Sequence, residues 1–319
     1  MLNVCLIGGG HGMSSTIKAL KKLNVSIKAI VGVSDDGGSS GILREKFNIL
    51  PPGDIRMVLS ALSTIDKNIL DVFNYRFPLM NNHPLGNFLI ASVINDCDDL
   101  TKAFNYLMQV FKCQGEIIPL SYYPLVLRYF YHDSQIGFGE SKAMAHMHNG
   151  INYIKVSDKK INPRTLTAIL EADFVIYCPG SFYSSLICNL TNIEVINALK
   201  NTKAKKIYLA NIFSEPHETY NLNLNDHINL LKKYVGADNL DLIIANNAII
   251  SADLITKHHK MGKKLLGDFL DEENKKITVF SDLLFINNKS VYHSISKRRL
   301  ILKKILFEKW WKDVLCSWR

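Results

Sequence analysis

The chain has 319 residues, of which 47% are hydrophobic and 21% charged, close to average usage in folded domains. This composition excludes a disordered or fibrous protein, and the length is enough for one large domain or two of ordinary size. The formal net charge is +9, but eight Lys or Arg against two acids between positions 297 and 319 supply most of it. We therefore expect no specific nucleic-acid binding.

Nothing in the sequence indicates export or a structural metal. The six cysteines form no C-x-x-C pair, the first residues lack the features of a signal peptide, and no apolar run approaches the ~18 residues that span a bilayer. We expect a cytoplasmic protein.

The first ninety residues alternate between strand and helix. We expect strands at 4–7 and 27–33, a helix at 14–23 between them, and further helices entered at Pro51 and near His83. Such alternation predicts a parallel sheet with helices on its faces.

The second half returns to this alternation after a helix at 98–112 and a β-rich section near 115–155. Strands are expected at 174–178, 207–212 and 242–245, each followed by small polar residues. The prediction is one α/β domain at 1–303, a Rossmann-like doubly wound and mainly parallel sheet with the β-rich section inserted. Ligands of such sheets bind beyond the carboxyl ends of the strands.

The first motif at such a strand end is GGGHG, from Gly8 to Gly12. A glycine loop between a strand and a helix lets backbone amides approach a phosphate at the positive end of the helix. The dinucleotide fingerprint G-x-G-x-x-G fails because Met13 stands where its third glycine would be. A turn that merely requires glycine is the alternative interpretation.

The second motif, VSDDGGSSG at 33–41, places two adjacent carboxylates, Asp35 and Asp36, at the end of a buried strand. Such a pair is costly to bury without a cation or hydrogen-bond donors. An NAD enzyme would need one acid here, not two, so the pair suits a cation with a phosphate. A solvated acidic turn is the alternative.

PPGDIR at 51–56 and three later strand ends add to the pattern. Asp54 could join Asp35 or Asp36 around Mg²⁺, and Arg56 has the geometry to bind phosphate, although the two could also be a helix cap and its surface companion. The later strand ends carry PLGNF at 84–88, CPGSFYSS at 178–185 and ANIFSEPHET at 210–219. Their convergence indicates one crevice for an anion or a nucleotide.

These motifs in this order resemble the gluconeogenesis factor family, the YvcK-like proteins related to CofD-type 2-phospholactate transferases. The resemblance covers roughly residues 1–303. It implies a CofD-like fold and a cytoplasmic sensor of UDP-N-acetylglucosamine or UDP-glucose, involved in cell shape, peptidoglycan synthesis and growth on gluconeogenic carbon. The alternative is a Mg²⁺-dependent phospholactate-type transferase acting on a nucleotide-diphosphate donor.

The residues expected at the ligand site are carried over from the family motifs. They are Gly8, Gly10, His11, Gly12, Asp35, Asp36, Gly37, Gly38, Ser39, Gly53, Asp54, Arg56, Asn87, Gly180, Ser181 and Asn211. No cofactor is expected to be required, and Asp36 with Asp54 is the expected Mg²⁺ pair. Catalytic residues are not assigned.

Three positions depart from the family pattern. His11 replaces a threonine of the glycine loop, Met57 stands where asparagine is common, and His217 replaces glycine. Each change alters polar contacts or backbone freedom, so ligand preference is expected to differ from the family norm.

The tail at 304–319 is expected to be an amphipathic helix, and the stretch from 297 to 319 holds all three tryptophans. Such a helix packs on its own domain, joins two copies in a homodimer, or contacts an anionic membrane surface weakly. A homodimer and a protein partner in cell-wall synthesis are the expected assemblies.

Overall fold

The computed structural model describes residues 1–140, 150–216, 218–287 and 290–308. Its centre is a seven-stranded sheet in the order β12-β11-β10-β9-β1-β2-β5, and every neighbouring pair is parallel. The strands are β1 (Leu2–Gly8), β2 (Val25–Val31), β5 (Glu116–Pro119), β9 (Phe174–Tyr177), β10 (Lys205–Leu209), β11 (Leu242–Asn246) and β12 (Thr278–Ser281). The Rossmann-like α/β prediction is confirmed.

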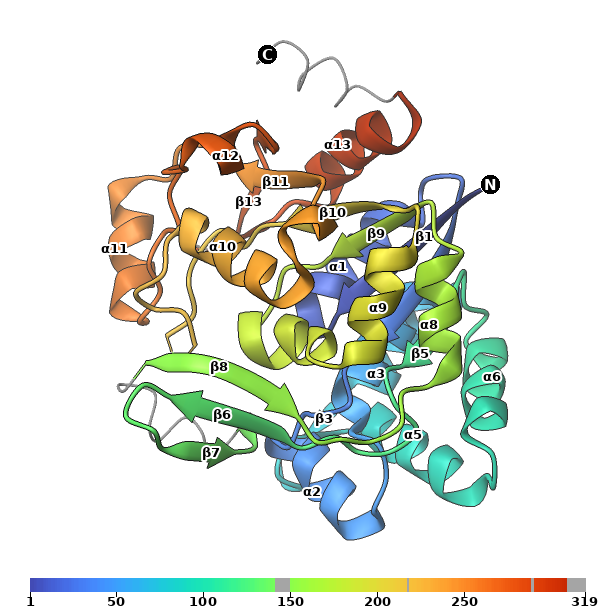
Figure 1. The fold of residues 1–319 in the computed structure, drawn as a ribbon. Coiled ribbons are helices and arrows are strands. Elements are labelled where there is room, and N and C mark those ends of the chain that lie inside the picture. Colours follow the sequence, from blue (N-terminus) through green and yellow to red (C-terminus); the bar gives the residue numbers. More distant parts are fainter. Residues whose placement is uncertain (141–149, 217, 288–289, 309–319) are drawn as a thin grey trace.

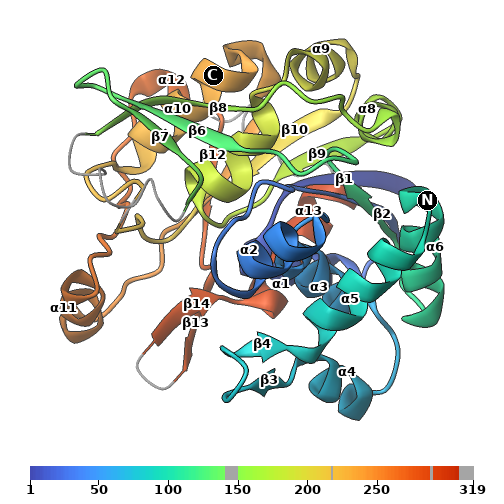
Figure 2. The same cartoon turned by 90° about the horizontal axis from the view of Figure 1, so that it is seen from below.

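Helices cover both faces of this sheet, which is why its central strands are continuous apolar runs. Figure 2 shows α1, α3, α5 and α13 on one side and α8, α9 and α10 on the other. The first group and its neighbours are α1 (Gly10–Leu20), α2 (Gly38–Phe47), α3 (Pro52–Leu62), α4 (Lys67–Asn74), α5 (Leu85–Asp96), α6 (Leu100–Val110) and α13 (Ile295–Phe307). The second is α8 (Pro163–Leu170), α9 (Ile193–Asn201), α10 (Leu224–Val235), α11 (Ala252–Lys260) and α12 (Glu272–Lys275).

The β-rich section divides between two sheets. Its first strand, β5, pairs with β2 at the edge of the main sheet. The other three strands form a separate antiparallel sheet in the order β7-β6-β8, which lies below α10 in Figure 1. They are β6 (Leu127–Tyr131), β7 (Ile136–Phe138) and β8 (Ile151–Val156).

Two hairpins and three short turns complete the described part of the chain. The hairpins are β3 (Arg76–Phe77) with β4 (His83–Pro84), and β13 (Leu284–Asn287) with β14 (Ser290–His293). The turns are η2 (Phe182–Leu186), a single π-helical turn, and the 3₁₀ turns η3 (Ile187–Leu190) and η4 (Ala237–Asn239).

Several expected boundaries shift. The first helix begins at Gly10 instead of residue 14, so the glycine motif forms its first turn. The stretch GGSSG, expected as a loop, opens α2 with Gly37 as its N-cap. At the C-terminus α13 ends at Phe307, and residues 309–319 of the expected tail helix lie outside the described residues.

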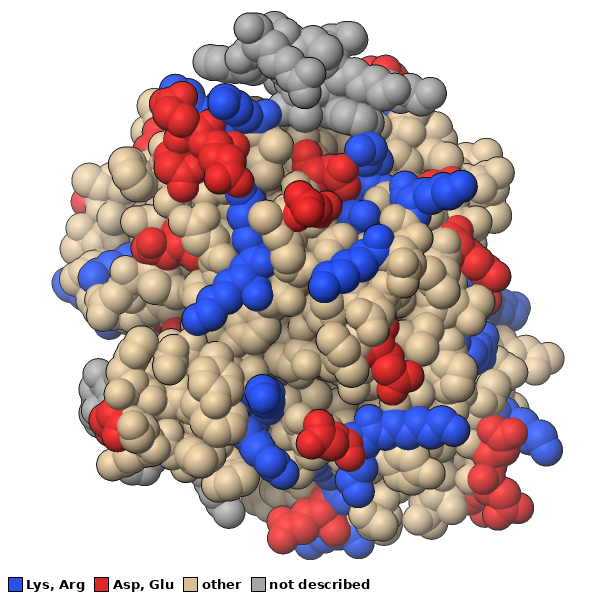
Figure 3. Space-filling model, in the orientation of Figure 1, with Lys and Arg blue, Asp and Glu red and all other residues tan. Residues whose placement is uncertain are grey.

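The surface carries charges of both signs. Figure 3 shows Lys and Arg side chains interspersed with Asp and Glu over the face seen in Figure 1. Positive charge therefore does not gather into one stripe on that face.

Candidate functional site

Two adjoining cavities lie beyond the carboxyl ends of the central strands. One, of about 420 Å³, is lined by the glycine loop, the end of β2, the start of α3 and the residues after β9; we call it the acidic cavity. The other cavity has a volume of about 370 Å³. It is lined by the first turns of α1, by the residues that follow β10 and by strand β14 itself, and we call it the hairpin cavity. The residues common to both are His11, Gly12, Gly180, Glu215 and Lys263.

The glycine loop packs directly against the loop that follows β9. A Cβ atom at Gly12 would lie 1.7 Å from the carbonyl oxygen of Pro179, so only glycine fits at this position. This contact brings the start of α1 and the segment at 179–181 to one rim. Both strands end there because β1 and β9 are parallel neighbours.

Asp35 and Asp54 approach each other in the acidic cavity. The Asp54 carboxylate accepts a hydrogen bond from the backbone N–H of Gly10, while Asp35 Oδ1 accepts one from the N–H of Gly37 at 2.9 Å. Burial, and then the charge of Asp35, raise the pKa of Asp54 to about 7. Burial also raises the pKa of Asp35. Both shifts arise first from burial, which disfavours the charged form of a carboxyl group.

Asp36 points elsewhere. A Cβ atom at Gly139 would lie 1.8 Å from Asp36 Oδ2, so this carboxylate lies against the β7 turn and does not line either cavity. Arg44 holds the acidic turn in place by donating to the carbonyl oxygens of Ser34 at 3.1 Å and of Leu125 at 2.7 Å.

This geometry bears on the expected Mg²⁺. The carboxylates that the structure brings together are Asp35 and Asp54, in place of the expected Asp36 and Asp54. Oxygen ligands of this kind fit Mg²⁺, which commonly takes one or two carboxylates and keeps several waters. Among the described residues no group of three or more His, Cys, Asp or Glu could hold a metal ion.

Arg56 and Asn87 belong to a separate hydrogen-bond network outside both cavities. Arg56 Nε donates to Asn87 Oδ1 at 3.0 Å, Asn87 Nδ2 donates to Ser39 Oγ at 2.9 Å, and Ser39 Oγ lies 2.6 Å from His83 Nδ1. Arg56, Asn87 and His83 are buried, so the network ties α2, α3 and α5 together behind the crevice.

The expected site residues thus divide into two groups. Those that line the cavities are Gly10, His11, Gly12, Asp35, Asp54, Gly180, Ser181 and Asn211. Those that do not are Gly8, Asp36, Gly37, Gly38, Ser39, Gly53, Arg56 and Asn87.

Asn211 positions the loop after β9. Its Oδ1 accepts from the N–H of Gly180 at 3.0 Å, and its Nδ2 donates to the carbonyl of Gly180 at 2.8 Å. Both the oxygen and the nitrogen of the Asn211 carboxamide therefore already have a protein partner.

Two glutamates cap the short turn η2. Glu215 Oε2 accepts from the N–H of Phe182 at 2.8 Å, and Glu218 accepts from those of Tyr183 at 2.7 Å and Ser184 at 3.1 Å. Burial raises the pKa of both glutamates. The first free amides of this turn are therefore occupied by carboxylates of the chain itself.

The structure adds residues that no local motif indicated. Glu140 and Lys263 line the acidic cavity, and Tyr292 lines the hairpin cavity. Burial, and then the charge of Asp35, raise the pKa of Glu140 to about 8. Burial, followed by the charge of Arg56, lowers the pKa of His11.

Within the described ranges no helix has the length and apolar character needed to cross a bilayer.

The fold and the paired cavities define a Rossmann-like α/β protein with its crevice at the carboxyl edge of the sheet. Residues 4–284 match the family described as 2-phospho-L-lactate transferase CofD. The gluconeogenesis factor of Listeria monocytogenes is 35% identical over 288 residues, which are 85% of this chain and 89% of that protein. That of Bacillus subtilis is 33% identical over 313 residues, 96% of this chain and 98% of its own.

A solved structure agrees with these relatives. Protein BH3568 from Bacillus halodurans superposes with a TM-score of 0.89 at 30% identity, covering 94% of this chain and 99% of that chain. The chain belongs to the gluconeogenesis factor family, the YvcK-like proteins related to CofD.

Proposed function

We propose that this protein is a regulatory gluconeogenesis factor that binds a nucleotide sugar, UDP-N-acetylglucosamine or UDP-glucose, in the two adjoining cavities. The observation that carries the proposal is that the cavities have different chemistry and share one glycine-lined strip beside the start of α1, with Lys263 as its lysine. The names of the relatives support the role in gluconeogenic growth. A role in cell shape is part of the same proposal.

The shared strip suits the diphosphate. It combines the N-terminal turn of α1 with the side chains of His11 and Lys263, and backbone amides at a helix start favour anions. Glu215 and Glu218 already accept hydrogen bonds from the backbone amides of η2. The diphosphate is therefore placed at the start of α1.

The two cavities suit the two ends of the ligand. Phe213, Val291 and Tyr292 give the hairpin cavity apolar and aromatic walls, which suit the flat face of a base. Asp35, Asp54 and Glu140 give the acidic cavity oxygen acceptors for sugar hydroxyls. The base therefore lies under β14, and the sugar lies between β2 and α3.

The test is a titration of the purified full chain with UDP-N-acetylglucosamine, UDP-glucose, GDP and NAD by calorimetry. We expect saturable binding of a UDP-sugar and weaker binding of NAD. Tyr292→Ala should weaken UDP and UDP-sugar alike, whereas Tyr123→Ala, a change of an exposed tyrosine that lines neither cavity, should not. Absence of saturable UDP-sugar binding contradicts the proposal.

A transferase of the phospholactate type is the second candidate, favoured by the approach of Asp35 and Asp54 beside the glycine loop. If Mg²⁺ is bound, these carboxylates would hold it, and the ion would supply charge neutralisation for a diphosphate. The chain's own residues would bind and orient the donor at the strip. Transfer from a nucleotide-diphosphate donor to an added acceptor, detected by mass spectrometry, would establish this activity; its absence would favour the sensor.

The assembly and location are proposed on the sequence alone. We propose a cytoplasmic homodimer that acts on a protein partner of cell-wall synthesis, with weak membrane contact through residues 297–319. Light scattering tests the dimer. Vesicle co-sedimentation of the full chain and of a chain truncated after residue 308 tests the contact, and equal sedimentation of both chains contradicts it.

A further inference from the structure

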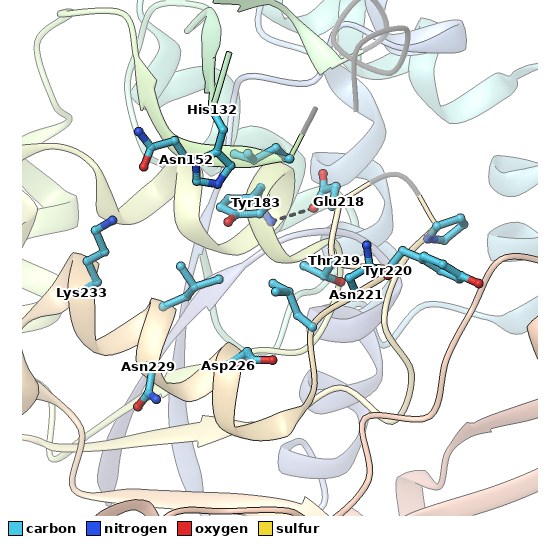
Figure 4. A pocket seen from close by; sticks show the side chains of 15 residues that line it. His132, Asn152, Tyr183, Glu218, Thr219, Tyr220, Asn221, Asp226, Asn229 and Lys233 are labelled. Atoms are coloured by element: carbon cyan, nitrogen blue, oxygen red, sulfur yellow. Dashed lines mark hydrogen bonds between the residues drawn. The ribbon is translucent and has the colours of Figure 1, made fainter. Parts of the chain in front are cut away.

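A third cavity, of about 480 Å³, lies on the other side of η2 from the acidic cavity. Figure 4 shows its walls: His132 and Asn152 from the small sheet, Tyr183 from η2, the segment 218–221, and one face of α10. We call it the α10 cavity. Its volume lies in the range of small-molecule sites.

One face of α10 forms a wall of the cavity. Asp226, Asn229, Leu230 and Lys233 recur at the i, i+3, i+4 and i+7 spacing of a single helical face. At ~1.5 Å per residue this face extends about 10 Å from Asp226 to Lys233. The cavity therefore has an acidic end and a basic end along one helix.

The acids of this cavity already have partners. Asp226 Oδ2 accepts from the N–H of Asn223 at 2.9 Å in a capping box, and Glu218 accepts from the amides of η2. Burial also raises the pKa of Glu218 to about 7, which reduces its negative charge near neutral pH.

In the part of the chain that the structure describes, Lys233 and His132 have no acidic partner of this kind. Within the described ranges neither Lys233 nor His132 forms an ion pair, although both face the cavity from opposite walls. The adjacent Lys232 is different, because it pairs with Glu273 at 2.6 Å and does not line the cavity. At the basic end of the α10 cavity, Lys233 therefore has no carboxylate partner among the described residues, and the His132 ring lies on the facing wall.

The remaining walls offer hydrogen bonds without charge. Asn152 and Asn221 present carboxamides, which both donate and accept, and Asn221 Oδ1 already accepts from Lys264 Nζ at 3.3 Å. The carboxamide of Asn229 is held by Asn274, whose Nδ2 donates to Asn229 Oδ1 at 2.9 Å. Tyr183 and Leu230 add apolar surface beneath them. This combination suits the hydroxyls and the ring faces of a sugar.

We propose that the α10 cavity is a second ligand site, separate from the nucleotide-sugar crevice, for a small phosphorylated sugar. Its phosphate lies between Lys233 and His132, and its hydroxyls lie against Asn152 of the small sheet and Asn221 of the segment 218–221.

The position of Glu218 connects this site to the crevice. Its carboxylate caps Tyr183 and Ser184, and Ser184 lines the acidic cavity on the opposite side. A ligand that orders the segment 218–221 would therefore steady the wall of the crevice as well. The second site gives the protein a means to register two metabolites at once.

The experiment is calorimetric titration of the full chain with glucose 6-phosphate, and with glucose and inorganic phosphate separately. We expect saturable binding of glucose 6-phosphate at least about tenfold tighter than that of either part. Lys233→Gln should weaken it about tenfold, the effect of losing one charge-assisted hydrogen bond, and His132→Ala should weaken it by removing a hydrogen-bond partner of the phosphate. The matched control is Lys232→Gln, which removes a neighbouring lysine outside the cavity and should bind as the parent does.

Each alternative result is decisive. No saturable binding of glucose 6-phosphate, or an equal loss in Lys232→Gln and Lys233→Gln, overturns the site. Binding of inorganic phosphate as tight as that of glucose 6-phosphate overturns the assignment of a sugar. UDP-sugar affinity measured on the same variants separates this site from the crevice. Lys233→Gln should keep the UDP-sugar affinity of the parent even if it loses glucose 6-phosphate binding.

Discussion

The carboxamide of Asn211 pairs with both backbone polar groups of Gly180, at 3.0 and 2.8 Å. This pair fixes the loop after β9 against the residue that follows β10. Gly180 lines both cavities. The shape of the crevice therefore depends on the Asn211 side chain, whether or not that side chain contacts the ligand.

Asn211→Asp tests this dependence. Aspartate accepts but does not donate, so the bond to the Gly180 carbonyl is lost and a second carboxylate joins Glu215 in the hairpin cavity. We expect unfolding free energy to fall by about 1 kcal/mol, and UDP-sugar affinity by about tenfold. Urea unfolding and calorimetry measure the two effects. The exposed Asn201→Asp is the control, and unchanged affinity in Asn211→Asp contradicts the role.

Gly12→Ala tests the contact between the glycine loop and Pro179. The new methyl group would lie 1.7 Å from a backbone oxygen, which cannot move aside as a flexible side chain would. We expect a loss of about 1–3 kcal/mol in unfolding free energy, as for overpacked sites. Gly37→Ala is the control because its nearest atom is 3.4 Å away and its φ of −91° suits alanine. Equal stability of the two variants would refute the contact.

Asp54 and Glu140 should contribute stability that is lost as pH rises. The folded-state pKa values of Asp54 and Glu140, about 7 and about 8, lie above their ordinary values of 3.8 and 4.5. At these two groups the folded protein therefore binds more protons than the unfolded chain between about pH 4 and 8, and each proton released at higher pH destabilises it. Urea unfolding of the parent and of Asp54→Asn at pH 5.5 and pH 8 measures this contribution. The buried His227 and His293, whose pKa values burial lowers, act in the opposite direction but equally in both proteins, so the comparison isolates Asp54. Asp54→Asn should lose less stability than the parent between pH 5.5 and pH 8, and an unchanged pH dependence would be inconsistent with a raised pKa at Asp54.

Mg²⁺ should act through Asp54 and not through Asp36. A cation between Asp35 and Asp54 stabilises their charged forms, so added Mg²⁺ should raise the Tm more at pH 8 than at pH 5.5. Asp54→Asn should abolish the effect, whereas Asp36→Asn, whose carboxylate lies against Gly139, should retain it. Loss of the effect in Asp36→Asn alone would restore the pair expected from the sequence.

Local patterns were sufficient for the sheet and for the places where the crevice forms. Short apolar runs such as residues 4–7 and 174–178 become central strands because both faces of a parallel sheet are covered. Their ends share one edge, so the motifs around Gly12 and Gly180 were expected to meet. The GGSSG segment was misjudged, since its glycines suggested a loop although Gly37 and Gly38 start α2.

The sequence by itself determined the family, the parallel sheet and the rim at which Gly12, Asp54 and Gly180 gather, because these depend on hydrophobic periodicity and on motifs beside each strand. Tertiary structure alone decided which of two adjacent aspartates faces the crevice, and that Arg56 and Asn87 lie in a network behind it. It also brought in Glu140 and Lys263, which follow no nearby motif. Side-chain direction depends on packing between segments far apart in the chain, and a linear pattern does not contain that information.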